Sequence, residues 1–267
     1  MWLRVVNVTV YAVAMAYLES VIVVYLRRLY YPQGFAFPLV IIDLPTLLLE
    51  LGREAATIVM LATVGIAAGR TKVGKCAYFL FLFGVWDIWY YIWLKVFVDW
   101  PPSLLTWDVL FLIPVPWVGP VLAPVTVALT MIGMGLMMLR LEQHGPVLPA
   151  GTTVWLAQSA ASLLVIVSFT MDIVPRLPNN GALLAQWTPT HYRWWMLIVG
   201  QALAIGTFVH WAWHTSRAQG RGGAGARKRG DEGARGRGGQ GNHAMTPCSS
   251  LPRSAALPPS ASSSGVG

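Results

Sequence analysis

The sequence predicts an all-α fold: a polytopic transmembrane helix bundle of about six spans, with a short Pro-rich interfacial or re-entrant segment and a disordered C-terminal tail. Of the 267 residues, 55% are hydrophobic and only 11% are charged, whereas roughly a quarter are charged in soluble domains. Long uncharged runs recur up to about residue 216, and only lipid can cover that much apolar side chain. The chain therefore divides into a transmembrane helical domain, residues 1–216, and a tail, residues 217–267.

The first span is expected at about residues 5–26. It is closed by Arg27 and Arg28 and then by Tyr30-Tyr31-Pro32, an aromatic and proline stop typical of a membrane interface. The start of the chain is similar to a secretory signal, but no small-residue cleavage pattern follows, so this helix is expected to be retained. The second span should begin near Pro45, whose fixed φ suits a first helical turn. The later spans are expected at about residues 45–69, 76–98, 121–141, 153–174 and 194–215.

Two segments do not fit a simple series of apolar spans separated by polar loops. The second span ends in Gly65-Ile-Ala-Ala-Gly69, a small-xxx-small pattern that either permits close helix contact or only loosens the helix end. The segment Leu104–Trp117 is apolar but too short to cross a bilayer. Four prolines interrupt or follow it, at 114, 116, 120 and 124. It is therefore interpreted as an interfacial or re-entrant segment and not as a span.

The formal net charge of +8 lies mostly in the tail, where arginines occur among Gly, Ala, Ser and Pro. Such a segment cannot bury enough apolar surface to order itself. Its cations favour contact with anionic lipid, and nucleic acid is the less favoured partner. An even number of spans puts both termini on one side, and the tail together with the basic loop Arg70–Lys75 favours the cytoplasm. The protein is thus expected in the cell membrane with both termini cytoplasmic.

Five charged residues lie inside the predicted spans. An ionised side chain there costs several kcal/mol unless it is paired with an opposite charge or hydrated. At roughly 1.5 Å of rise per residue, the four carboxylates fall in one layer about 15–21 Å from the cytoplasmic face. Glu50 and Glu54 share one helix face, with Arg53 beside both. The predicted polar intramembrane site consists of Glu19, Glu50, Arg53, Glu54 and Asp87.

One arginine cannot neutralise four carboxylates, so some must be protonated, or a cation or water-filled cavity must be present. The preferred function is a transporter or a proton- or ion-handling membrane component. The alternatives are a metal-dependent intramembrane enzyme, for which carboxylates suit a divalent cation such as Mg²⁺, Ca²⁺ or Mn²⁺, and a non-catalytic assembly subunit. A purely structural clamp between helices also fits. Catalytic residues and oligomeric state stay open.

His210 and His214 lie four residues apart near the end of the last span, which is a familiar spacing for metal ligands. By the same helical rise, His210 misses the carboxylate layer by about 10 Å. A belt of Trp and His at a membrane interface explains this pair better than a metal does. The two histidines are therefore weak metal candidates, separate from the carboxylate set.

Overall fold

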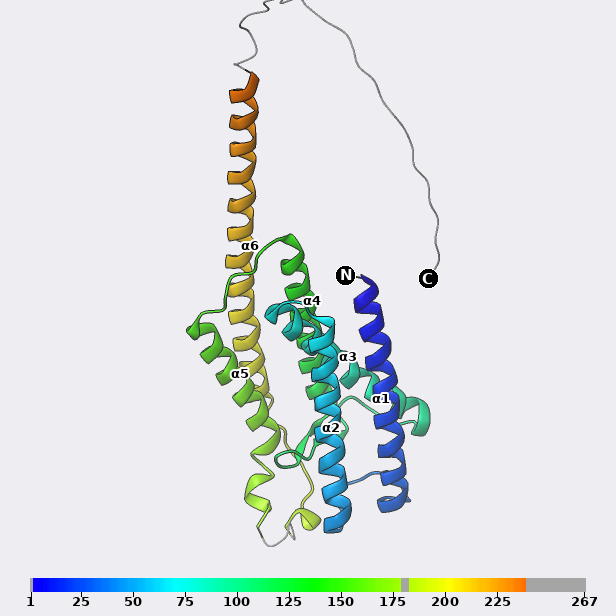
Figure 1. Ribbon diagram of the computed structural model, residues 1–267. Coiled ribbons are helices and arrows are strands. Elements are labelled where there is room, and N and C mark those ends of the chain that lie inside the picture. The colour runs from blue at the N-terminus through cyan, green and yellow to red at the C-terminus, as the bar shows by residue number, and fades with distance from the viewer. Residues whose placement is uncertain (1, 179–182, 239–267) are drawn as a thin grey trace, which may run out of the picture. The chain divides into compact units, whose positions relative to one another are not determined.

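The computed structural model describes residues 2–178 and 183–238, with side chains up to residue 221. Within these ranges the chain forms six α-helices and one two-stranded hairpin, which confirms the all-α fold class (Figure 1). Two short 3-10 turns, Val174–Arg176 and Leu184–Gln186, follow α5. In chain order the elements are α1 (Trp2–Tyr30), α2 (Leu44–Ala68), α3 (Lys72–Val98), β1 (Trp107–Phe111), β2 (Trp117–Pro120), α4 (Leu122–His144), α5 (Thr152–Thr170) and α6 (Trp194–Gly238).

Among the described residues, five helices are long and apolar enough to cross a membrane: α1, α3, α4, α5 and the Trp194–Arg221 part of α6. Helix α2 has 25 residues but carries the charged residues Glu50, Arg53 and Glu54 in its first half. It remains a predicted sixth span. Helix α6 continues to Gly238, beyond the expected end at residue 215. Residues 239–267 of the predicted disordered tail lie outside the described residues.

The helix ends have local causes in the sequence. Asp43 caps α2, because its carboxylate accepts a hydrogen bond from the Thr46 backbone N–H at 3.1 Å, and Pro45 occupies the first turn. Thr71 caps α3 by accepting from the Gly74 N–H at 2.9 Å. Helix α3 ends at Val98, and the next residue, Asp99, caps it in the left-handed conformation with φ 51°. The predicted start of the second span near Pro45 thus agrees with the structure.

Helix α3 is the central element and packs against α1, α2 and α4. Glycines permit its close approach to two of these neighbours. A Cβ at Gly84 would lie 2.5 Å from the carbonyl oxygen of Ala128 in α4, and one at Gly65 would lie 2.9 Å from the backbone N of Phe79. Of the two interpretations of the Gly65–Gly69 pattern, close helix contact is therefore the correct one at Gly65.

The Pro-rich segment does not span, as expected, but it contains a hairpin that sequence analysis missed. Strand β1 pairs antiparallel with β2, with Asp108 opposite Gly119 and a bulge between Val109 and Phe111. Strand pairing provides hydrogen bonds for the backbone N–H and C=O groups of this non-helical segment. A non-helical segment is tolerated at membrane depth only where protein covers it. Asp108 and Val118 are buried. The hairpin is thus part of the packed interior.

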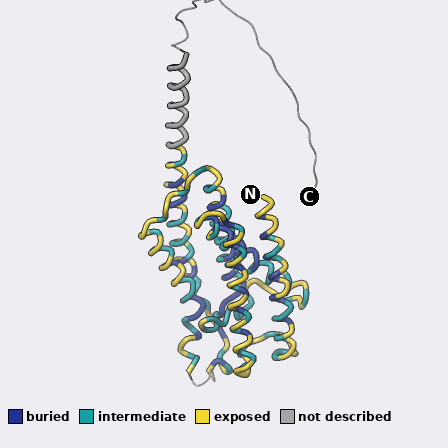
Figure 2. Tube along the Cα trace, viewed as in Figure 1, coloured by how far each residue is buried: buried dark blue, intermediate teal, exposed yellow. Residues whose placement is uncertain are grey.

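Buried residues gather along α3 and its contacts, while outward faces of the helices are exposed (Figure 2). Every helix carries exposed large apolar side chains, for example Val10, Leu49, Val96, Leu129, Leu156 and Ile198. A soluble protein of this size rarely exposes so much apolar surface. This surface is suited to lipid, so contact with a bilayer follows from composition and structure together.

Candidate functional site

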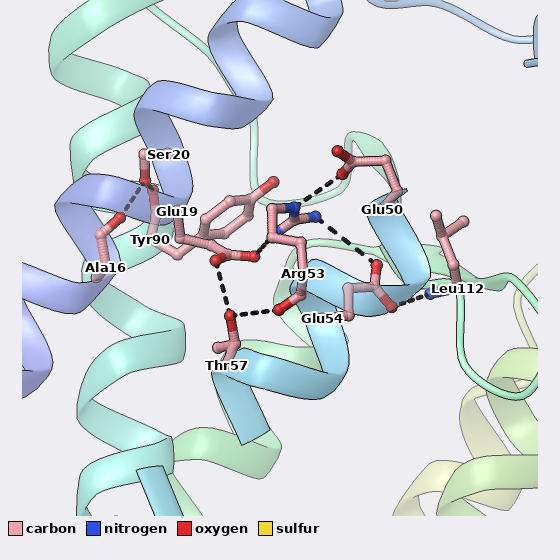
Figure 3. A network of polar contacts seen from close by, with 9 residues as sticks. All are labelled: Ala16, Glu19, Ser20, Glu50, Arg53, Glu54, Thr57, Tyr90 and Leu112. Atoms are coloured by element: carbon pink, nitrogen blue, oxygen red, sulfur yellow. Dashed lines mark hydrogen bonds and ion pairs between the residues drawn. The ribbon is translucent and has the colours of Figure 1, made fainter. Parts of the chain in front are cut away.

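Arg53 in α2 lies at the centre of three carboxylates (Figure 3). Its Nε donates to Glu50 Oε2 at 2.8 Å, one helical turn away, and its Nη2 lies 3.9 Å from Glu54 Oε1. A third ion pair joins Arg53 to Glu19 of α1. The three glutamates are each only 6–7% exposed. We call Glu19, Glu50, Arg53 and Glu54 the carboxylate–arginine cluster.

Neutral groups hold two of these carboxylates in place. The Thr57 hydroxyl lies 3.1 Å from Glu19 Oε2 and also 3.1 Å from the Arg53 carbonyl oxygen, so it can donate to either. The backbone N–H of Leu112, just after β1, donates to Glu54 Oε2 at 2.8 Å. The cluster therefore joins α1, α2 and the hairpin. Its three carboxylates face one guanidinium, which leaves an excess of negative charge unless protons or cations are bound.

Asp87 of α3 lies beside the cluster. It lines a small cavity of about 50 Å³ together with Glu19, Arg53 and Glu54. The indole Nε1 of Trp86, which lines the same cavity, is buried and has no hydrogen-bond partner among the described residues. That nitrogen itself does not reach the cavity, but a cavity of this size, lined by three carboxylates and an arginine, has room for water. The arrangement therefore suits a hydrated polar site between α1, α2 and α3.

A second buried ion pair lies near the end of α1. Arg27 Nη2 contacts Asp108 Oδ1 of β1 at 3.0 Å. The guanidinium carbon lies 3.7 Å from the ring centroid of Trp100 and 4.6 Å from that of Phe35, two cation–π contacts that fix its position. Asp108 is only 1% exposed, so Arg27 is the cation that offsets its charge.

Three members of the cluster, Glu50, Arg53 and Glu54, and the second ion pair open onto one large cavity of about 830 Å³. Its walls come from the end of α1, the 31–43 loop, the first half of α2, the hairpin and the turns after α5. Most lining residues are apolar. The charged ones are Arg27, Asp43, Glu50, Arg53, Glu54 and Asp108.

The two candidate metal ligands of α6 lie elsewhere. The rings of His210 and His214 meet edge to face with centroids 4.5 Å apart, and both residues are exposed. Neither lines the two cavities. Across the described ranges, no three His, Cys, Asp or Glu residues are grouped so that they could hold one metal ion. The divalent-cation alternative thus has no donor set in that part of the chain.

The structure brings together all five residues predicted for the polar site: Glu19, Glu50, Arg53 and Glu54 in direct contact, with Asp87 at the adjoining cavity. Sequence analysis missed Arg27 and Asp108. Arg27 was interpreted only as a helix-end cation, and Asp108 lies in the segment interpreted as interfacial. The signal that could have identified Asp108 was the presence of a carboxylate inside the apolar run Leu104–Trp117.

Comparison of this chain with models of known protein families, with curated proteins and with solved structures finds no significant match.

Proposed function

We propose that this multi-pass membrane protein is a transporter that moves protons or small cations through the carboxylate–arginine cluster and Asp87. The observation that carries the proposal is the charge imbalance: three buried glutamates contact one arginine. Ionisable groups inside a membrane are expensive and are most often kept for function. A bound proton or cation offsets the excess negative charge of the cluster. Release of that ion restores the negative charge, so the site is ready to bind again.

The cavities support a path for such an ion. Glu54 lines both the small cavity and the large one, so it can exchange a proton or cation between them. Glu50 lines only the large cavity, and Glu19 and Asp87 line only the small one. The four carboxylates therefore form a series with Glu54 in the middle. Under the proposed topology, with cytoplasmic termini, the large cavity lies toward the outer side, where α1 ends.

The competing interpretation is a structural clamp, because Arg53 also joins α1 to α2 through Glu19. The third possibility, an assembly subunit, requires that the carboxylates pair with a partner chain. Both predict that the isolated protein carries no ion flux. Flux is therefore the property that separates transport from the other two.

The test is proton flux in liposomes that contain the purified protein and a pH-sensitive dye. With an imposed pH gradient, and with Na⁺ or K⁺ gradients in parallel, the wild type should dissipate at least one gradient faster than protein-free liposomes do. An Asp99→Asn variant is the matched control, because Asp99 is exposed and lies outside both cavities. Flux equal to that of protein-free liposomes under every gradient would overturn the proposal.

A further inference from the structure

The walls of the large cavity carry more negative than positive charge. Among the described residues that line it, the charged ones are four carboxylates and two arginines. Arg27 and Asp108 balance each other, whereas Arg53 is shared by three glutamates. With its carboxylates ionised, the cavity therefore attracts a cation and repels an anion.

Glu50 offers such a cation a free acceptor. Among the described residues its carboxylate makes one hydrogen bond, in which Oε2 accepts from Arg53 Nε at 2.8 Å (Figure 3). The other oxygen, Oε1, has no hydrogen-bond partner there, yet it is not one of the partnerless atoms that are cut off from solvent. It therefore keeps accessible surface, although Glu50 as a whole is only 7% exposed. Glu50 lines the large cavity, so this oxygen is available to a molecule bound there.

The rest of the cavity suits an apolar body. Its volume of about 830 Å³ falls within the range of roughly 300–1,000 Å³ that is usual for ligand sites with mostly apolar walls. A proton or a bare metal ion does not fill such a space. The loop that forms one wall exposes Val40 and Ile41, at 43% and 56%. Because these apolar side chains both line the cavity and reach the surface, a lipid-soluble molecule can enter past them.

We propose that the large cavity binds a lipid-soluble organic ammonium ion, whose N–H donates to Glu50 Oε1 and whose apolar body lies along the cavity walls. A hydrogen bond between an ammonium and a carboxylate is one of the strong, charge-assisted kind. Arg53 keeps its bond to Oε2, so binding breaks no existing contact of Glu50. This inference rests on the proposed function, because it names the class of cation that the carboxylate–arginine cluster would move.

The test is photolabelling of the full chain in phosphatidylcholine nanodiscs at pH 7, with a twelve-carbon primary amine that carries a diazirine in its chain. The alcohol and the carboxylic acid of the same chain are the comparison probes. Peptide mass spectrometry should find the amine label in residues 109–116, which line the cavity through Val109, Leu112 and Val115. Label on residues 155–163 of α5, where Trp155 and Leu156 face outward, corrects each probe for its partition into the bilayer.

After this correction the alcohol should label residues 109–116 at least roughly tenfold less than the amine does, which is the order expected for loss of one hydrogen bond between charged groups. The carboxylic acid should label them no better than the alcohol, because the cavity walls repel its negative charge.

A variant gives a second measurement. Glu50→Gln keeps the size of the side chain and an oxygen that accepts from Arg53, but it removes the negative charge. Labelling by the amine should fall to the level of the alcohol. Asp99→Asn is the matched control, because Asp99 is an exposed carboxylate outside both cavities, so its labelling should equal that of the wild type. If Glu50→Gln fails to fold, the three probes compared on the wild type decide the question.

Equal labelling of residues 109–116 by amine and alcohol, or amine labelling that Glu50→Gln leaves unchanged, would overturn the proposal. Failure here is distinguishable from failure of the proposed function. Ion flux without selective labelling removes the organic cation as substrate and keeps transport of protons or small cations. Selective labelling without ion flux keeps the ammonium site and removes transport.

Discussion

The N-terminal and C-terminal regions of the helical domain differ in the side chains that form polar contacts between their elements. In the N-terminal region, comprising α1, α2, α3 and the hairpin, the contacts between elements include buried charged side chains, with three glutamates around Arg53, beside neutral ones such as Ser20 to the Tyr90 carbonyl. In the C-terminal region, α4 to α6, the contacts between the helices themselves involve neutral, partly buried side chains, and the ion pair of Arg193 with Asp172 lies outside the helices and is partly exposed. Gln201 of α6 exchanges hydrogen bonds with Thr126 and Thr130 of α4 at 2.9 and 2.8 Å, and Gln158 of α5 donates to the Ala204 carbonyl at 2.9 Å.

The comparison bears on the clamp interpretation. Neutral hydrogen bonds between membrane helices contribute roughly 0.6–2 kcal/mol each, and in the C-terminal region they join α4, α5 and α6 together with apolar packing. Burying charges costs several kcal/mol per ion before pairing. A clamp alone does not require that cost, and this difference supports the proposal that the carboxylate–arginine cluster exchanges an ion.

The largest expected effect follows from removing the one cation of the cluster. Arg53→Gln leaves three buried carboxylates without a positive partner, which should lower the free energy of unfolding by about 3–5 kcal/mol. Denaturant unfolding in detergent measures this. Because protonation removes the repulsion between the carboxylates, the loss should shrink as pH is lowered.

Arg140→Gln is the control for this variant, since Arg140 is exposed in α4. Its free energy of unfolding should change by less than about 0.5 kcal/mol. A pH-independent loss in Arg53→Gln, or no loss at all, would mean that the glutamates are already neutral and that Arg53 does not balance them.

The next effect concerns the contact that joins the two regions. Gly84→Ala in α3 places a Cβ 2.5 Å from the Ala128 carbonyl oxygen in α4, so the helices must separate. Overpacking of this kind should lower the free energy of unfolding by about 1–3 kcal/mol. Denaturant unfolding in detergent measures this loss. In the control Gly133→Ala the new methyl group meets nothing within 4 Å, so stability should hold or rise. Equal stability of both variants would contradict the close α3–α4 packing.

A smaller effect is expected for the neutral contacts. Gln201→Leu removes the hydrogen bonds to Thr126 and Thr130 and should cost about 1 kcal/mol, with ion flux unchanged in liposomes. Adding Thr126→Val should cost less than the two single changes summed, because both variants remove a shared bond. Loss of flux in Gln201→Leu at unchanged stability would break the division between the two regions.

The smallest effect is expected at the surface. Asp99 pairs with Lys95 at 2.7 Å in an exposed ion pair, and such pairs contribute about 0–1 kcal/mol. Asparagine also tolerates the left-handed conformation of Asp99. Asp99→Asn should therefore unfold within about 0.5 kcal/mol of the wild type. A larger loss would show that this end of α3 contributes more to stability than its exposure indicates.

Much of the fold could be predicted because bilayer physics constrains it. Each of the six ranges expected from the sequence overlaps one of the six described helices, and Pro45 marked the start of α2. The ends were less predictable: α1 continues past Arg27 to Tyr30 because basic and aromatic residues stop a span without stopping a helix. The hairpin was missed because prolines in a short apolar segment exclude a helix but do not specify strand pairing.

The candidate site could be predicted in part, and for a physical reason. Glu19, Glu50, Glu54 and Asp87 stand out as carboxylates in apolar helices, and the helical rise predicted that they lie at one depth. Their contacts required the packing of α1 on α2. Asp108 was missed because its burial depends on the hairpin folding into the helices, which no local pattern in Leu104–Trp117 encodes.

The most direct test of the central claim pairs flux with stability for Glu54→Gln. The new side chain keeps its size and can still accept the hydrogen bond from Leu112, but it can no longer exchange a proton and has no negative charge with which to balance a cation. If Glu54 carries the ion, flux in liposomes should fall to the level of protein-free liposomes while the free energy of unfolding stays near that of Gln201→Leu. Wild-type flux, with or without a loss of stability, would contradict a transport role for Glu54 and favour the clamp.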